Sequence, residues 1–340
     1  MSIPLQALAQ TTSTRQPVIF DALGEIRTVY TPELIDQILA SGTRAISITL
    51  TDPKVDEADA FDHLLRDLAE YNLYLRGLAS RFQLARNVSD IESARQSNKL
   101  AVLYNVQNST PVGHDIDRLG LLKGLGLTSI QLTYNTTNAS GSGCFENPDP
   151  GLTAFGRQLI EAMGSHRLLL DLSHAGMKTM AQAVAASSQP VIVSHTACKA
   201  LREHRRNTSD ENMRAVADGG GVVGITQIRT FLTYAKQNNL GTYFDHIEHA
   251  VKVAGVDHVG IGSDRDHRVI PDTAEELAIL LKEEGSQISA EDWPLYLQGM
   301  NGPRRMETVR DGLKQRKFNS SEIDKIMGAN VLRLYQQVVG

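Results

Sequence analysis

Two stretches, LLLDLSH (168–174) and VIVSH (191–195), decide the expected fold, because each is a short apolar run that ends on a histidine. A third run, HVGIGSD (258–264), ends on Asp264 in the same way. Continuous runs of Val, Ile and Leu indicate parallel strands that are buried on both faces. Imidazole and carboxylate groups at the carboxyl ends of such strands are typical of a metal site in an α/β barrel.

Eight strands of this kind can be placed along the chain, and amphipathic helices separate most of them. The strands are expected at residues 17–20, 44–50, 101–107, 128–134, 168–174, 191–195, 221–228 and 258–264. Helical periodicity covers residues 31–40, 61–71, 151–163 and 209–218, and two helical segments fall between residues 54 and 98. Eight strand–helix units in sequence predict an α/β fold, a (β/α)8 TIM barrel, rather than an open doubly wound sheet.

The chain from about residue 272 to residue 340 has a helical pattern. Its helical segments are expected at residues 273–284, 291–300, 303–314 and 321–338. We interpret them as the final barrel helix and a C-terminal helical cap. Residues 1–340 are therefore predicted to form a single barrel domain with a C-terminal helical extension.

Composition narrows the class of protein. The 340 residues are 41% hydrophobic and 21% charged, with a net charge of −5, and they show no basic stripe that would bind nucleic acid. The first residues lack the pattern of a signal peptide, and no apolar run approaches the length of a membrane span, so a cytoplasmic location without a membrane partner is expected. The two cysteines, Cys144 and Cys198, fit a reducing compartment and are expected to be small buried hydrophobes.

The predicted strand ends are mostly polar, although the strands themselves are apolar. A single histidine at a strand end is more often a hydrogen-bonded structural residue than a metal ligand. Two histidines together with a strand-end aspartate favour a metal site. The residues at these ends are Phe20 and Asp21, Thr49 to Asp52, Asn105, Gln107, Tyr134, His174, His195, Gln227, Asp264, Asp266 and His267.

Several stretches together resemble the membrane (renal) dipeptidase family of the amidohydrolase superfamily. They include LTYNTTNASGSG, DLSHAGMKTM, PVIVSHTACKAL, HRRNTSDENMRAVADGGGVVG and AGVDHVGIGSDRD, and the similarity is densest between about residues 100 and 270. The resemblance implies that His174 and His195 hold the second of two zinc ions. It implies that Asp264 is a ligand of the first zinc and accepts a proton from the attacking water. Arg206 would bind the terminal carboxylate of the substrate, which suits a planar guanidinium.

The sequence departs from the family pattern at several ligand positions. The first-strand motif D-x-H-x-D reads Asp21-Ala22-Leu23-Gly24-Glu25, so leucine replaces a histidine ligand and Glu25 could replace the second aspartate. The bridging glutamate of the third strand is matched by Gln107, or else by Asn105 or Asn108, and a neutral amide bridges two dications poorly. Tyr134 replaces a histidine that polarises the substrate, and His267 replaces a glycine as a candidate ligand.

Counting the remaining ligands predicts one divalent cation, zinc, or none. His174, His195 and Asp264 supply the three ligands that a mononuclear site needs, with Tyr134, Glu25, His267 and Gln107 in reserve. The sequence thus predicts a metal-dependent hydrolase that cleaves a dipeptide or a similar small amide. Two alternatives stay open: the same barrel acting on a non-peptide molecule such as a lactone, and a metal-free, non-catalytic homologue. The resemblance also implies a homodimer.

Overall fold

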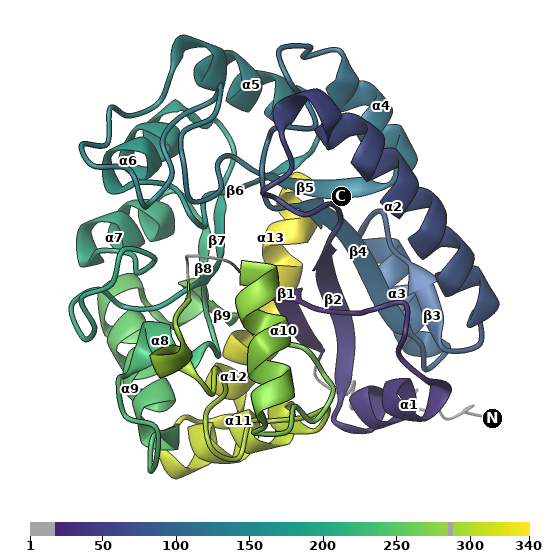
Figure 1. Cartoon of the computed structure of the whole chain (residues 1–340), viewed down its shortest axis with the longest axis vertical. Coiled ribbons are helices and arrows are strands. Elements are labelled where there is room, and N and C mark those ends of the chain that lie inside the picture. Colours follow the sequence, from purple (N-terminus) through teal and green to yellow (C-terminus); the bar gives the residue numbers. More distant parts are fainter. Residues whose placement is uncertain (1–17, 285–287) are drawn as a thin grey trace, which may run out of the picture.

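Eight parallel strands pair edge to edge into a closed barrel in the computed structural model, which describes residues 18–284 and 288–340 (Figure 1). The strands follow one another around the barrel, and β2 closes the ring by pairing with β4. Residues Ala45 to Thr49 of β2 lie beside Ala101 to Asn105 of β4. The barrel strands are β1 (Ile19–Gly24), β2 (Thr43–Thr49), β4 (Leu100–Val106), β5 (Leu127–Gln131), β6 (Leu169–Asp171), β7 (Ile192–Thr196), β8 (Val222–Ile225) and β9 (Val259–Ile261). The predicted (β/α)8 barrel is therefore confirmed.

Helices connect the strands on the outside of the barrel (Figure 1). The first of them shows how local sequence sets a boundary: Thr31 caps α1 by accepting the Leu34 N–H, and Pro32 takes the first turn, where its missing N–H costs nothing. The helices are α1 (Pro32–Ala40), α2 (Glu57–Gly77), α3 (Val88–Gln96), α4 (Arg118–Leu125), α5 (Ala154–Ser165), α6 (Met177–Ala186), α7 (Asp210–Asp218), α8 (Arg229–Leu232), α9 (Leu240–Ala254), α10 (Ala274–Glu284), α11 (Arg305–Gln315), α12 (Ser320–Asp324) and α13 (Asn330–Val338).

Several elements differ from the sequence-based expectation. Strands β5, β6 and β9 each end three residues before the predicted end, so His174 and Asp264 follow their strands and do not close them. Strand β1 continues four residues past the predicted end at residue 20, so Asp21 lies within the strand and not at its end. A short strand, β3 (Phe82–Leu84), pairs with β4 outside the barrel between α2 and α3 and was not predicted. The helix expected at 291–300 is only a short 3-10 turn, Ala290–Asp292, because Pro294 lacks an N–H and disfavours helical geometry at the residue before it.

The C-terminal segment contributes to two parts of the barrel. Helix α13 packs beneath the barrel, where Val331, Leu334 and Tyr335 lie in one apolar cluster with Phe20 of β1. The rings of Phe20 and Tyr335 have centroids 5.1 Å apart. Helix α10 instead contributes to the wall of the cavity at the opposite end of the barrel. Within the described ranges, no helix combines the length and the apolar character that crossing a membrane requires.

Candidate active site

A cavity of about 710 Å³ opens at the carboxyl ends of the barrel strands. This is the end at which barrel enzymes place their reacting groups. The loops that follow β1, β2, β5, β6, β7 and β9 line it, and residues of α2 and α10 complete the wall. Of the residues predicted from the sequence, the cavity wall includes Glu25, Gln107, Tyr134, His174, Arg206 and Asp264.

His174 lines the cavity, and His195, which does not line it, lies directly behind His174. The Nε2 atom of His174 lies 2.9 Å from the Nε2 atom of His195, and the rings cross at 61°. Both side chains are buried, with 6% and 0% of their surface exposed. The sequence placed both histidines at strand ends, and the structure brings the two imidazoles together.

Hydrogen bonds to the other ring nitrogens fix the tautomers. Nδ1 of His174 lies 2.6 Å from Oδ1 of Asn135, which can only accept, so this Nδ1 carries the proton. Nδ1 of His195 lies 2.9 Å from Oγ of Ser194. The Ser194 hydroxyl donates its own hydrogen to Asp171 at 2.5 Å and therefore accepts from His195. Each neutral ring thus directs the bare lone pair of its Nε2 at the other.

Asp171 supports this arrangement from below. Its Oδ1 accepts the backbone N–H groups of Ser173 at 2.9 Å and Ser194 at 3.1 Å. Burial raises the pKa of Asp171, and these hydrogen bonds oppose that rise. A carboxylate that orients an imidazole through an intermediate hydroxyl is typical of the outer shell of a metal ligand.

A proton between the two imidazoles is disfavoured. Burial lowers the pKa of His174 and of His195 well below the ordinary value, and the nearby Arg206 guanidinium lowers both further. Two acceptor lone pairs 2.9 Å apart repel each other unless a cation lies between or beside them. In a tetrahedral zinc site with bonds of 2.0–2.1 Å, two ligand atoms lie ~3.3 Å apart, so a few tenths of an ångström separate the observed pair from that arrangement.

Arg206 and Tyr134 form the wall beside the histidines. The Tyr134 ring stacks on His174 with centroids 4.2 Å apart. Arg206 is only 4% exposed, donates from Nη2 to the carbonyl of His195 at 3.2 Å and leaves its Nε without a partner. Its guanidinium lies 5.3 Å from the centre of the Phe231 ring. A buried guanidinium with an unused donor beside a cavity is suited to an anionic ligand.

Asp264 reaches the same cavity from the end of β9. Its backbone has a φ of 54°, and its N–H donates to the carbonyl of Leu23 at 2.9 Å. Gly262 allows the backbone of β9 to approach β7 closely: a Cβ there would lie 1.8 Å from the carbonyl oxygen of Ser194 and 3.3 Å from Cα of His195. The glycine thus brings the chain that carries Asp264 next to the histidine strand.

The replaced ligand positions lie around the same cavity. Leu23 is 2% exposed and offers no donor atom. The Glu25 carboxylate pairs with Nε of Arg27 at 2.7 Å. Gln107 donates from Nε2 to Oγ1 of Thr49 at 2.8 Å, and it reaches the cavity, whereas its two alternatives, Asn105 and Asn108, do not line it.

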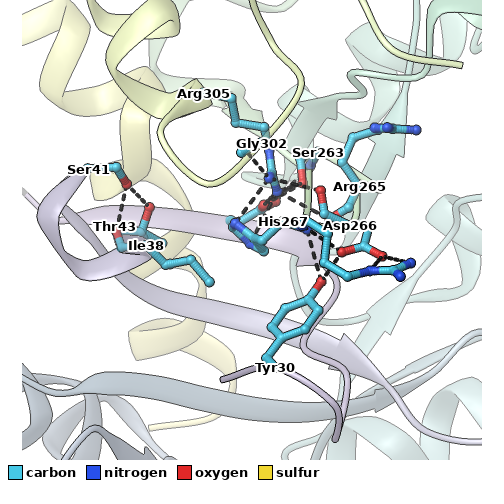
Figure 2. A network of polar contacts seen from close by, with 12 residues as sticks. Tyr30, Ile38, Ser41, Thr43, Ser263, Arg265, Asp266, His267, Gly302 and Arg305 are labelled. Carbon is cyan, nitrogen blue, oxygen red and sulfur yellow. Dashed lines mark hydrogen bonds and ion pairs between the residues drawn. The ribbon is translucent and has the colours of Figure 1, made fainter. Parts of the chain in front are cut away.

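His267 lies outside the cavity. It is fully buried, and its Nδ1 and Nε2 lie 3.0 and 3.2 Å from the two terminal nitrogens of Arg305 (Figure 2). The same guanidinium donates to Oγ of Ser263 at 3.0 Å and lies 3.6 Å from the Asp21 carboxylate. The structure therefore does not bring His267 together with His174 and His195.

Across residues 18–284 and 288–340, no three His, Cys, Asp or Glu side chains lie close enough to form a ready cation site. The convergent lone pairs of His174 and His195 fit one cation, and they need a third ligand to move toward them. The neutral side chains of Leu23 and Gln107 do not fit a second, bridged cation.

Sequence reasoning missed two arginines at this end of the barrel. Arg265 lies between Asp264 and Asp266 in the sequence and lines the cavity. Arg305 lies at the start of α11 and fills the buried space behind β1 and β9. The position of Arg265, next to the predicted ligand Asp264, could have indicated that it belongs to the site. For Arg305 the sequence holds no such signal, because the helical pattern does not show which of the adjacent arginines, Arg304 or Arg305, points inward.

A closed parallel barrel with a polar cavity at the carboxyl ends of its strands defines a class of barrel enzyme that acts on small molecules. The particular family follows from comparison with known proteins. The family model of membrane dipeptidases, peptidase family M19, matches residues 32–278, and the chain belongs to this family.

Individual relatives agree with this assignment. An uncharacterized protein in the pqqA 5′ region of Klebsiella pneumoniae is 28% identical over 290 residues, which cover 82% of this chain and 97% of that protein. An uncharacterized dipeptidase of Schizosaccharomyces pombe is 30% identical over 253 residues, which cover 73% of this chain and 55% of that protein, so the chain spans about half of its length. The crystal structure of an amidohydrolase from Pseudomonas aeruginosa superimposes with a TM-score of 0.83 and 27% identity, covering 95% of this chain and 96% of that one.

Proposed function

We propose that this protein hydrolyses a dipeptide or a similar small amide and that it uses one divalent cation, zinc, held by His174 and His195. The observation that carries the proposal is the convergence of two bare Nε2 lone pairs, 2.9 Å apart, where His174 lines a cavity that a buried arginine, Arg206, also lines. Imidazole nitrogen is a preferred ligand of zinc, and both rings are held in the tautomer that metal binding requires.

Asp264 is the proposed third ligand because it lines the cavity and because Gly262 brings its chain segment next to Ser194 and His195. A zinc ion bound there would polarise the amide carbonyl and lower the pKa of a water molecule. The side chains would supply the remaining functions. The Asp264 carboxylate would act as the general base and accept the proton of the attacking water, a role that requires it to lie within hydrogen-bond distance of that water.

Arg206 and Tyr134 would hold the substrate. The Nε of Arg206 has no partner, so a substrate carboxylate can pair with the guanidinium without breaking an existing ion pair. The Tyr134 ring already packs against His174, which fixes its position next to the reacting amide. With its carboxylate bound by Arg206, the substrate would place its amide bond between Arg206 and the two histidines.

Metal content is the deciding measurement. The full chain would be purified without a tag, supplied with zinc, dialysed and analysed by elemental mass spectrometry, alongside His195→Ala. About one zinc per chain that is lost in the variant supports the proposal. About two would contradict the single ion and would mean that Glu25 or Gln107 also contributes to binding.

Turnover is the second measurement. The one-zinc protein should hydrolyse members of a dipeptide panel, and activity only on lactones or other non-peptide substrates would select the alternative substrate class. No zinc and no turnover would contradict the proposal and favour a non-catalytic homologue.

A further inference from the structure

Arg265 has a buried guanidinium at the wall of the cavity, and among the described residues no side chain forms a hydrogen bond or an ion pair with it. The residue is only 7% exposed and lines the cavity together with its neighbours Asp264 and Asp266. Its Nε is buried and makes no hydrogen bond. Among the residues that the structure describes, its terminal nitrogens make no hydrogen bond or ion pair. The guanidinium lies 5.9 Å from the centre of the Tyr296 ring, and the carboxylates of Glu25, Asp264 and Asp266 attract it at longer range.

The nearby acidic side chains are already engaged with other groups. Asp266 accepts from the Tyr30 hydroxyl at 2.5 Å and pairs with Arg268 at 2.6 Å. Glu25 pairs with Arg27 at 2.7 Å, and Arg27 also lies 3.3 Å from Asp266. In Figure 2 the Arg265 side chain points away from the cluster around Arg305, while Asp266 turns toward Tyr30. Glu25, Asp264 and Asp266 therefore attract the Arg265 guanidinium from a distance, but none of them makes a hydrogen bond or an ion pair with it in the described part of the chain.

An unpaired buried guanidinium is costly. Removing an ion from water is unfavourable unless an opposite charge and hydrogen bonds replace the hydration. At the wall of a cavity, the N–H donors of such a guanidinium are available to bind an anionic ligand in a bidentate geometry. Arg206 has the same character on the other side of the site, because its Nε is also buried and unused.

We propose that Arg265 forms a second anion-binding subsite, so that the substrate is a small amide that carries two acidic groups, one bound by Arg206 and the other by Arg265. This inference rests on the proposed function, because it takes the cavity to be the substrate site. It names a substrate class: dipeptides with an acidic side chain, or acylated amino acids whose acyl group ends in a carboxylate.

Binding without turnover tests this inference directly. The full chain would be treated with a chelator and titrated calorimetrically with four dipeptides, L-Ala-L-Glu, L-Ala-L-Gln, L-Glu-L-Ala and L-Gln-L-Ala. Each acidic peptide differs from its partner by one anionic group at nearly constant shape. Glutarate and its monoamide, glutaramate, would be titrated as probes that contain no peptide bond.

An acidic probe is expected to bind about tenfold more tightly than its amide, in line with a charged hydrogen bond. Arg265→Met should reduce this preference to within about twofold, and Arg265→Lys should retain part of it. The matched control is Arg268→Met, which removes a cavity-lining cation that Asp266 already neutralises and should leave the preference unchanged. Circular dichroism would confirm that each variant is folded.

The outcomes separate this inference from the proposed function. Equal binding of acidic and amide probes, or an unchanged preference in Arg265→Met, would overturn the Arg265 subsite while leaving dipeptide hydrolysis untouched. Binding of glutarate that depends on Arg265, with no binding of any dipeptide, would support the subsite and contradict the peptide substrate. Failure of every probe to bind would overturn the subsite.

Discussion

The Nε2 atoms of His174 and His195 lie 2.9 Å apart, and neither carries a hydrogen in the tautomers that Asn135 and Ser194 impose. This contact predicts a specific role for Ser194. Its hydroxyl orients His195 by accepting from Nδ1, so Ser194→Ala should weaken zinc binding by about 10–100-fold. The control is Ser41→Ala, which removes a buried hydroxyl from the turn after α1. Zinc affinity would be measured by competition with a chromogenic chelator, and equal affinities for the two variants would contradict the role.

Asp264 offers a test of the proposed base. Asn is the suitable replacement, because the φ of 54° lies in the left-handed region that Asn tolerates better than most residues. Asp264→Asn should lower kcat by about 10²–10⁴-fold, the usual contribution of a general base, without changing the unfolding midpoint by more than a few degrees. Steady-state kinetics and thermal unfolding would be measured together, and full activity would exclude the role.

Arg206 should act on substrate binding more than on the chemical step. Arg206→Met is expected to raise KM for a dipeptide by about 10–100-fold, the loss of a charged hydrogen-bonded pair. A C-terminally amidated dipeptide is the matched control, because it lacks the carboxylate and should bind the wild type and the variant alike. A variant that loses affinity equally for both substrates would show that Arg206 supports the site by another route, such as its bond to the His195 carbonyl.

The buried ion pair between Arg305 and Asp21 should stabilise the fold only as a unit. Both side chains are fully buried, and the one guanidinium of Arg305 contacts Asp21, Ser263 and His267. Arg305→Met should cost about 3–5 kcal/mol because it leaves a buried carboxylate uncompensated. The double variant with Asp21→Asn should lose less than the sum of the single losses. Denaturant unfolding of the four proteins would measure this coupling, and strict additivity would contradict it.

His246 should make stability depend on pH. Its Nδ1 accepts the backbone N–H of Cys198 at 3.0 Å, its Nε2 lies 3.1 Å from the Leu232 carbonyl, and burial lowers its pKa to about 4. The unfolded chain takes up this proton near pH 6.5, before the folded chain does. The stability that neutral His246 provides is therefore complete above pH 6.5 and declines as the pH falls toward 4, by roughly 3 kcal/mol.

The matched variant is His246→Gln, whose amide can make both hydrogen bonds without titrating. Urea unfolding would be compared between pH 8 and pH 4. The free-energy difference between the two proteins should shift in favour of the variant as the pH falls, because all other titrating groups are shared. A constant difference would show that His246 does not titrate in this range.

The sequence was sufficient for the barrel because its strands are continuous apolar runs that end on polar residues. It misplaced the end of β1 because Asp21 looked like a strand-end carboxylate, whereas Ser263 and Arg305 satisfy it inside the barrel. It missed β3 because three residues, Phe82–Leu84, carry too little periodicity to mark a strand. Both errors depend on contacts between distant segments.

The candidate site was predictable only in part for the same reason. Strand-end position was enough to select His174, His195 and Asp264, since a barrel gathers its strand ends at one rim. It could not separate Asp264, which lines the cavity, from His267, which turns away to Arg305 three residues later. Nor could it show that Arg265 makes no direct ion pair among the described residues, because that depends on which neighbouring acids already bind Tyr30, Arg27 and Arg268.

Helix α13 supplies apolar side chains to the base of the barrel, and Tyr335 meets Phe20 of the first strand there. During synthesis, β1 leaves the ribosome long before this helix exists. The apolar side chains at the base of the barrel therefore stay uncovered until helix α13 has been synthesised, which makes the nascent chain a candidate client for chaperones. A stop codon shortly before residue 330 would yield an aggregating chain instead of a slightly shortened enzyme, because the core of the barrel would stay open to water.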